Sequence, residues 1–90
     1  MDKKNLKAIE WQLAEDSSTI HSFGYDEKSS TLFVIFKDKQ GNETRTYQYE
    51  GVEKDKWLNM VAIQASPYST GSWFNENIKK NPAYKTTEIK

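Results

Sequence analysis

Hydrophobic and polar positions alternate with a period of two over the first half of the chain, a pattern typical of β-strands. The alternation predicts strands in four segments separated by polar turns: residues 8–13, 18–25, 31–37 and 44–50. The third segment is apolar on both faces, with Leu32, Val34 and Phe36 on one face and Phe33 and Ile35 on the other. A strand of this kind lies inside a sheet. The segments therefore predict an antiparallel meander in which residues 31–37 form a central strand.

The period changes to that of an α-helix after Gly51. Between residues 53 and 66, an apolar stripe at i, i+3, i+4 and i+7 has Trp57 and Met60 at its edge. The stripe consists of Leu58, Val61, Ala62 and Ala65. This spacing predicts one amphipathic helix that covers one face of the sheet.

The last third of the chain predicts a second, shorter helix. Residues 72–81 have Ser72 as a candidate N-cap, and Asn81 before Pro82 ends the run. The tail, residues 83–90, could either pair at a sheet edge or remain unpaired. The predicted fold class is α+β: a small twisted antiparallel sheet of three or four strands, one amphipathic helix and a short C-terminal helix. We expect residues 1–90 to form a single domain with a core over residues 9–80 and basic termini that fray.

Composition narrows the class of protein. Three tryptophans, five tyrosines and four phenylalanines supply a core for a chain of 90 residues. Thirteen basic and thirteen acidic residues cancel, which removes the net positive field of a non-specific duplex DNA binder. The absence of cysteine excludes disulfides and thiolate zinc sites. Together with the absence of a signal peptide or a membrane-spanning run, it predicts a cytoplasmic location.

Six short blocks resemble the KTSC domain family. They are IEW at 9–11, SSTI at 17–20, FGYD at 23–26, LFVIF at 32–36, YQYEGV at 47–52 and STGSWFNENI at 69–78. That family is a small module found at the C-terminus of some lysyl-tRNA synthetases and as stand-alone bacterial and phage proteins. The resemblance implies the fold, but the family has no defined activity to carry over. Where the family has a Ser-Lys-Gly step, this chain has Ser69, Thr70 and Gly71, which calls any ligand shared by the family into question here.

The only histidine, His21, lies among serines and aspartates and suggests a nucleophilic cluster. Strand alternation predicts that His21 faces the same way as Phe23 and Tyr25, while Ser22 faces the other way with Ile20. The chemistry of a Ser-His-Asp triad requires the three groups to converge, so we expect no catalytic residues and no enzyme activity. A single histidine with scattered acids also predicts no metal site and no cofactor.

Two segments have the residue types that bind anions and bases. Arg45 and Tyr47 share one face of a strand, and arginine beside aromatic rings can grip a phosphate and stack on a base. The second segment offers hydroxyls and backbone N–H groups at a helix start, with Trp73 for stacking: Ser69, Thr70, Gly71, Ser72 and Asn75. Each segment also has a purely structural interpretation, in which Tyr47 and Trp73 pack in the core.

We therefore expect a non-catalytic binding module that holds a nucleotide or short RNA. In a phage, such a module could sequester a nucleotide immune signal of the host. The alternative is an inhibitor or adaptor that acts on a host protein through its sheet edge and exposed aromatic residues. Self-association fits either hypothesis, and neither involves a membrane.

Overall fold

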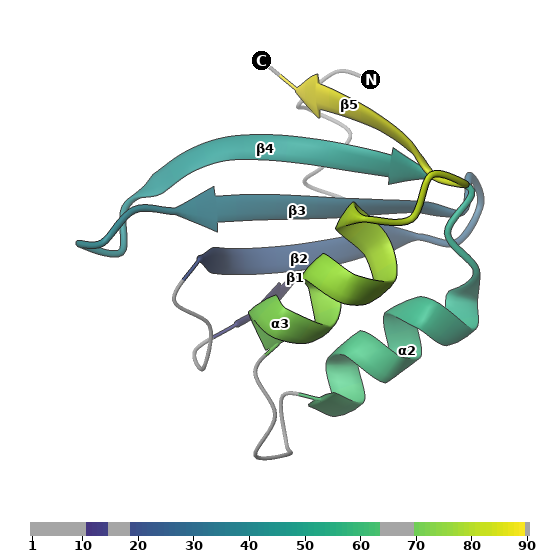
Figure 1. Ribbon diagram of the computed structural model, residues 1–90, viewed down its shortest axis with the longest axis horizontal. Helices are drawn as coiled ribbons and strands as arrows, with labels where there is room; N and C mark the ends of the chain where they lie inside the picture. The colour runs from purple at the N-terminus through teal and green to yellow at the C-terminus, as the bar shows by residue number, and fades with distance from the viewer. Residues whose placement is uncertain (1–10, 15–18, 64–69, 90) are drawn as a thin grey trace.

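The computed structural model describes residues 11–14, 19–63 and 70–89. They form an α+β fold with a five-stranded antiparallel sheet in the order β1-β2-β3-β4-β5 (Figure 1). The strands are β1 (Trp11–Leu13), β2 (Ile20–Asp26), β3 (Thr31–Lys37), β4 (Glu43–Glu50) and β5 (Lys85–Ile89). The prediction of three or four strands is wrong, because the tail pairs with β4 and adds a fifth strand at the edge.

β3 lies at the centre of the sheet, as its two apolar faces predicted. Leu32 and Val34 are fully buried in the main core, and Phe36 packs against it. On the opposite face, Phe33 is buried in a second cluster with Ile89 and Trp11. The sheet thus has one face for the main core and one for this smaller cluster.

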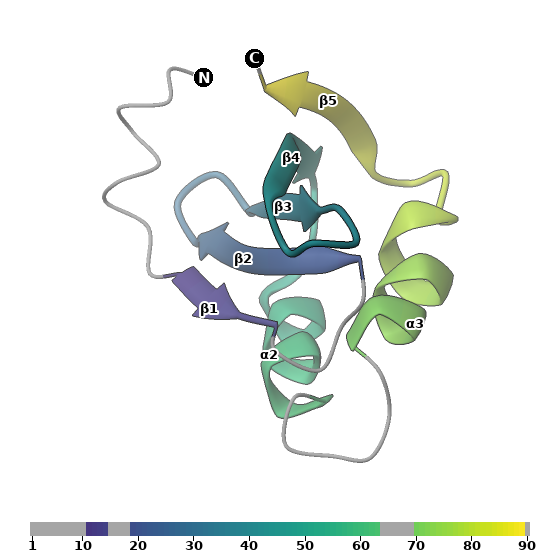
Figure 2. The ribbon, with the colours of Figure 1, turned by 90° about the vertical axis from the view of Figure 1, so that its left-hand side faces the viewer.

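The helical segments are α2 (Lys54–Ile63), α3 (Thr70–Phe74) and the π-helix η1 (Asn75–Lys79). α2 and α3 lie on the same side of the sheet (Figure 2). Met60 of α2, Phe74 of α3 and Ile78 of η1 belong to one core cluster with the inward side chains of β2 and β3. η1 widens the helix at its end, where the backbone N–H of Lys80 donates to the carbonyl of Asn75 at 3.1 Å. Because α3 begins at Thr70, Ser72 lies inside the helix, and its prediction as the N-cap is wrong.

The orientation of α2 differs from the predicted stripe. Leu58, placed on that stripe, is 46% exposed, whereas Met60 is fully buried. Ala62 is also exposed. The Trp57 ring stacks on Tyr25 of β2 with 5.3 Å between centroids and 11° between planes. Burying these larger side chains removes more apolar surface from water than burying Leu58 and Ala62 would, so the helix turns them toward the sheet.

Two buried tyrosines tie the sheet to neighbouring elements. Tyr49 of β4 is buried in the main core, and this burial raises its pKa to about 12. The Tyr84 hydroxyl donates a 2.8 Å hydrogen bond to Glu53 Oε2. The pKa of Tyr84 is raised to about 12 as well, mainly because the side chain is buried and secondly because of this hydrogen bond. The pKa of Glu53 is lowered by a backbone hydrogen bond of its own and by the Tyr84 hydroxyl.

We expect the free energy of unfolding to fall as the pH rises from 10 to 12. The unfolded phenol ionises near pH 10, whereas folded Tyr49 resists ionisation up to about 12. The stability that Tyr49 contributes is therefore complete below pH 10 and is lost through pH 12, on the order of 2 kcal/mol. Urea unfolding across this range should show a smaller loss for Tyr49→Phe than for wild type. Equal losses in the two proteins would contradict the assignment.

No helix in the described ranges is long and apolar enough to cross a membrane.

Candidate ligand-binding site

Two charged side chains flank a tyrosine on the helix-covered face of β4 and β5. Tyr47 of β4 is paired directly with Glu88 of β5, and directly opposed residues of an antiparallel pair have side chains on the same face. Arg45 lies two positions before Tyr47 on β4 and therefore on the same face. Hydrogen bonding with Tyr47 comes first among the causes that raise the pKa of Arg45, followed by charge interactions with Tyr47 and Glu88. We call these three residues the Arg45–Tyr47–Glu88 row.

The main core braces the Tyr47 ring. Tyr47 is half-buried, and its ring meets Phe36 edge to face with 5.6 Å between centroids. The ring centroid of Phe36 lies 5.9 Å from that of Phe74 of α3. Phe74 packs edge to face on Tyr49, with 5.2 Å between the ring centroids. These aromatic contacts place Tyr47 against the helical layer while leaving part of its ring at the surface.

Trp73, the neighbour of Phe74 on α3, is half-buried and packs against the same core. The Asn77 side chain donates a 2.9 Å hydrogen bond to the Trp73 carbonyl and fixes the turn that follows. The structure therefore brings three predicted residues, Arg45, Tyr47 and Trp73, to the helix-covered side of the sheet. Both aromatic side chains pack against the core, and neither is fully buried.

The predicted hydroxyl segment is only partly at the surface. Ser69 lies outside the described residues. Thr70 and Gly71 are buried at the start of α3, whereas Ser72 and Asn75 are exposed. α3 is five residues long and continues directly into η1. Ser72 and Asn75 are therefore the predicted site residues of this segment that lie at the surface in the described part of the chain.

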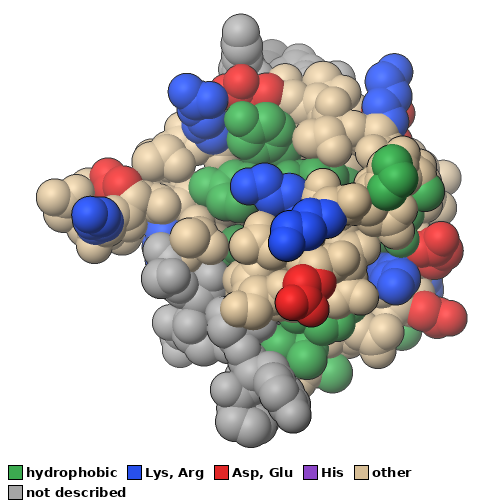
Figure 3. Space-filling view, viewed as in Figure 1, with side chains coloured by type: hydrophobic (Ala, Val, Ile, Leu, Met, Phe, Trp, Pro, Cys, Tyr) green, Lys and Arg blue, Asp and Glu red, His purple; other side chains and the backbone are tan. Residues whose placement is uncertain are grey.

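Two lysines lie together at the end of the helical segment, on a surface that also carries acidic side chains (Figure 3). Lys79 and Lys80, at the C-terminal end of η1, are both exposed. Figure 3 shows basic side chains over the helical segment in the middle of the face, beside hydrophobic surface.

The sequence does not predict Glu88 as a member of this row. Because the sequence leaves open whether residues 83–90 pair with the sheet, it assigns none of them to a face of the sheet. The signal available was the pair Thr86 and Thr87 in KTTEI, since β-branched residues favour strands.

His21 lies at an irregularity of β2. The register with β3 shifts between Ile20 and Ser22, which adds a residue at His21. Ile20 consequently packs in the same core as Phe23 and Tyr25, and the prediction that it faces with Ser22 is wrong. Strict alternation does not hold across a bulge.

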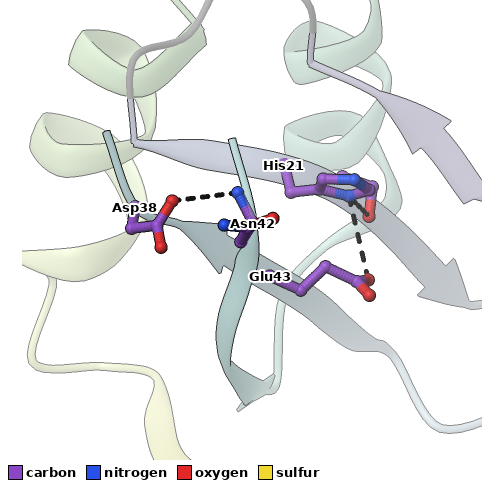
Figure 4. Close-up of polar contacts among 5 residues, drawn as sticks. His21, Asp38, Asn42 and Glu43 are labelled. Carbon is purple, nitrogen blue, oxygen red and sulfur yellow. Dashed lines mark hydrogen bonds and ion pairs between the residues drawn. The ribbon is translucent and has the colours of Figure 1, made fainter. Parts of the chain in front are cut away.

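The contacts of His21 do not form a catalytic triad. Its Nδ1 lies 3.1 Å from Ser22 Oγ and 3.9 Å from Glu43 Oε1, so both groups meet the same ring nitrogen (Figure 4). A triad needs the hydroxyl on one nitrogen and the carboxylate on the other. Ser22 is also buried. The cluster instead joins β2 to the start of β4.

The loop between β3 and β4 is closed by its own polar groups. The Asp38 carboxylate accepts hydrogen bonds from the backbone N–H groups of Gln40 and Asn42, both at 2.9 Å. Figure 4 shows the bond to Asn42. Gly41 has a φ of +86°, which favours glycine. The loop thus fixes the register in which β4 begins.

Residues 11–14, 19–63 and 70–89 contain no group of three or more His, Cys, Asp or Glu side chains arranged to hold a metal ion.

The fold and the row together define a small α+β domain with a charged and aromatic surface built on an edge of its sheet. The sequence profile of the KTSC domain matches residues 16–84, and the chain belongs to the KTSC domain family. The resemblance of the six blocks is therefore confirmed.

The chain is also similar to a solved structure, the crystal structure of a KTSC domain protein from Yersinia pestis. The two share 29% sequence identity with a TM-score of 0.71, over 91% of this chain and 99% of that one. No curated protein matches the chain.

Proposed function

We propose that this KTSC domain is a non-catalytic binding module that holds a nucleotide-type anionic ligand on the Arg45–Tyr47–Glu88 row. The observation that carries the proposal is the placement of Arg45 on the same face of β4 as Tyr47, whose ring is only half-buried. It pairs a permanent positive charge with an aromatic surface. That combination suits a phosphate next to a base, since bases stack on aromatic rings and arginine binds phosphate.

The other residues have supporting roles in this proposal. Trp73 offers a second stacking surface, and Ser72 and Asn75 offer hydrogen bonds to phosphate or sugar. Thr70 and Gly71 hold the start of α3 from the interior. Ser69 remains a predicted phosphate contact. In a phage, sequestering a nucleotide immune signal of the host would be the biological use of such a module.

A thermal-shift panel tests the proposal. The panel contains nucleoside monophosphates, cyclic dinucleotides, ADP-ribose derivatives and short single-stranded RNA, with inorganic phosphate as the control. A ligand at about 100 times its dissociation constant adds roughly 2.7 kcal/mol of stability. For a domain of this size, that raises the midpoint by about 10 °C or more. A flat panel would contradict the proposal.

A second candidate function is that of an inhibitor or adaptor that binds a host protein by pairing one of its strands with the sheet edge. β5 is the last strand in the sheet order, pairs with β4 without a register shift, and has exposed side chains at Lys85, Thr86 and Thr87. An edge of this kind can template a partner strand. Every aromatic side chain in the described ranges is buried or half-buried. The backbone of the sheet edge, rather than exposed aromatic side chains, would therefore have to contact the host protein.

Proline substitutions distinguish the second candidate from the first. Successive backbone N–H groups of a strand point to opposite sides, so Thr86 and Thr87 differ in where their N–H groups point. One of the variants Thr86→Pro and Thr87→Pro removes an N–H that points outward from the sheet edge, and the other removes an N–H that bonds to β4. Under strand addition, the first of these keeps the circular dichroism spectrum but loses a partner captured from host lysate. Arg45→Ala keeps that partner. Capture that depends on Arg45 and not on the edge would contradict strand addition.

A further inference from the structure

The Arg45–Tyr47–Glu88 row contains a group that phosphate binding does not need. Glu88 is half-buried on β5 and repels an anion, yet it stands directly opposite the ring that would receive a base. We propose that the row recognises a guanine nucleotide: Arg45 binds the phosphate, Tyr47 contacts the base, and the Glu88 carboxylate accepts hydrogen bonds from N1–H and the 2-amino group of guanine. This assignment of the ligand class rests on the proposed function.

The placement of the three side chains on one face of the sheet supports this assignment. Directly opposed side chains in an antiparallel pair start about 4.5–5.5 Å apart at Cβ, so the carboxylate of Glu88 can reach the edge of a base lying on Tyr47. Arg45 lies on the same face of β4, two positions before this tyrosine. A positive group, an aromatic ring and a negative group therefore occur together on one face. A nucleotide has the complementary sequence of groups: phosphate, sugar and base, then the donors at the base edge.

The chemistry of the bases selects guanine. A carboxylate has two acceptor oxygens and no donor, so it pairs best with two adjacent donors. Guanine presents N1–H and N2–H side by side. Adenine presents an acceptor at N1 beside its amino group, cytosine an acceptor at N3 beside its amino group, and uracil one N–H between two carbonyls. Each of these three bases brings at least one acceptor toward the carboxylate.

The test is isothermal titration of GMP, IMP and AMP into three proteins: wild type, Glu88→Gln and Glu50→Gln. IMP differs from GMP only by the missing 2-amino group. Wild type should bind GMP about tenfold more tightly than IMP, the value of one charge-assisted hydrogen bond, and AMP most weakly. Glu88→Gln should bring the three affinities together. Glu50→Gln makes the same chemical change on the opposite face of β4 and should retain the preference.

The outcomes separate this inference from the proposed function. If none of the three nucleotides binds wild type, guanine recognition is overturned, and the thermal-shift panel decides the proposed function by itself. If the three nucleotides bind wild type equally, or if Glu88→Gln strengthens all of them by the same factor, Glu88 merely offsets the charge of Arg45; guanine recognition is then overturned and nucleotide binding stands. The RNA pentamers UUGUU and UUAUU extend the comparison to a strand. Guanine recognition predicts that UUGUU binds more tightly, and comparison with GMP shows whether a free nucleotide or a guanosine within RNA fits better.

Discussion

Replacing Met60 with alanine is expected to lower the free energy of unfolding by about 2–5 kcal/mol. Met60 is fully buried between α2 and the sheet, so the truncation leaves a cavity in the main core. Leu58→Ala is the matched control, because Leu58 lies on the same helix, is 46% exposed and has a similar helix propensity. Its cost should stay below about 1 kcal/mol.

Urea unfolding of the two variants tests how α2 is rotated against the sheet. The apolar stripe in the sequence favours Leu58 as a core residue, whereas the structure buries Met60 and Trp57 instead. A larger loss for Leu58→Ala than for Met60→Ala would mean that the helix packs as the stripe predicts. The stacking of Trp57 on Tyr25 would then be absent in solution.

Replacing Arg45 with alanine is expected to weaken nucleotide binding by about tenfold to a hundredfold without unfolding the protein. Hydrogen bonds to charged groups contribute about 1.5–3 kcal/mol, and the fully exposed guanidinium contributes no core packing. Arg45→Lys should recover only part of the affinity, because lysine keeps the charge but not the two-pronged geometry that suits a phosphate. Isothermal titration with the best nucleotide of the thermal-shift panel measures both changes.

Lys39→Ala is the matched control for Arg45→Ala. Lys39 is an exposed basic residue in the loop between β3 and β4, away from the row. Removing it lowers the net charge by the same amount and should leave the affinity nearly unchanged. Equal losses from the two variants would mean that binding depends on overall charge, and the row would have no special role.

Alternation was sufficient to predict the strands at the centre of the sheet. β3 is apolar on both faces, and its neighbours follow from short polar turns such as the loop from Asp38 to Asn42. The bulge at His21 escaped prediction because one added residue reverses the facing of everything beyond it, and nothing in the local sequence marks the position. β5 escaped because its pairing depends on an available edge of β4, which is a property of the assembled sheet.

The candidate site was predicted only in part. Spacing at i and i+2 on one strand was enough to place Arg45 beside Tyr47. Burial of Thr70 and Gly71 depends on how α3 packs against the core, which local sequence does not determine. Glu88 joins the site through a contact between β4 and β5, some forty residues apart in the chain, so no motif could reveal it.

The central claim is that a nucleotide binds on the Arg45–Tyr47–Glu88 row. Its most direct test is an NMR titration of the ¹⁵N-labelled protein with the best nucleotide of the thermal-shift panel, following the backbone amides and the indole N–H of Trp73. The account predicts that the largest shift changes cluster at residues 45–47, 72–75 and 88. Changes confined to other parts of the chain, or no changes at millimolar nucleotide, would contradict it.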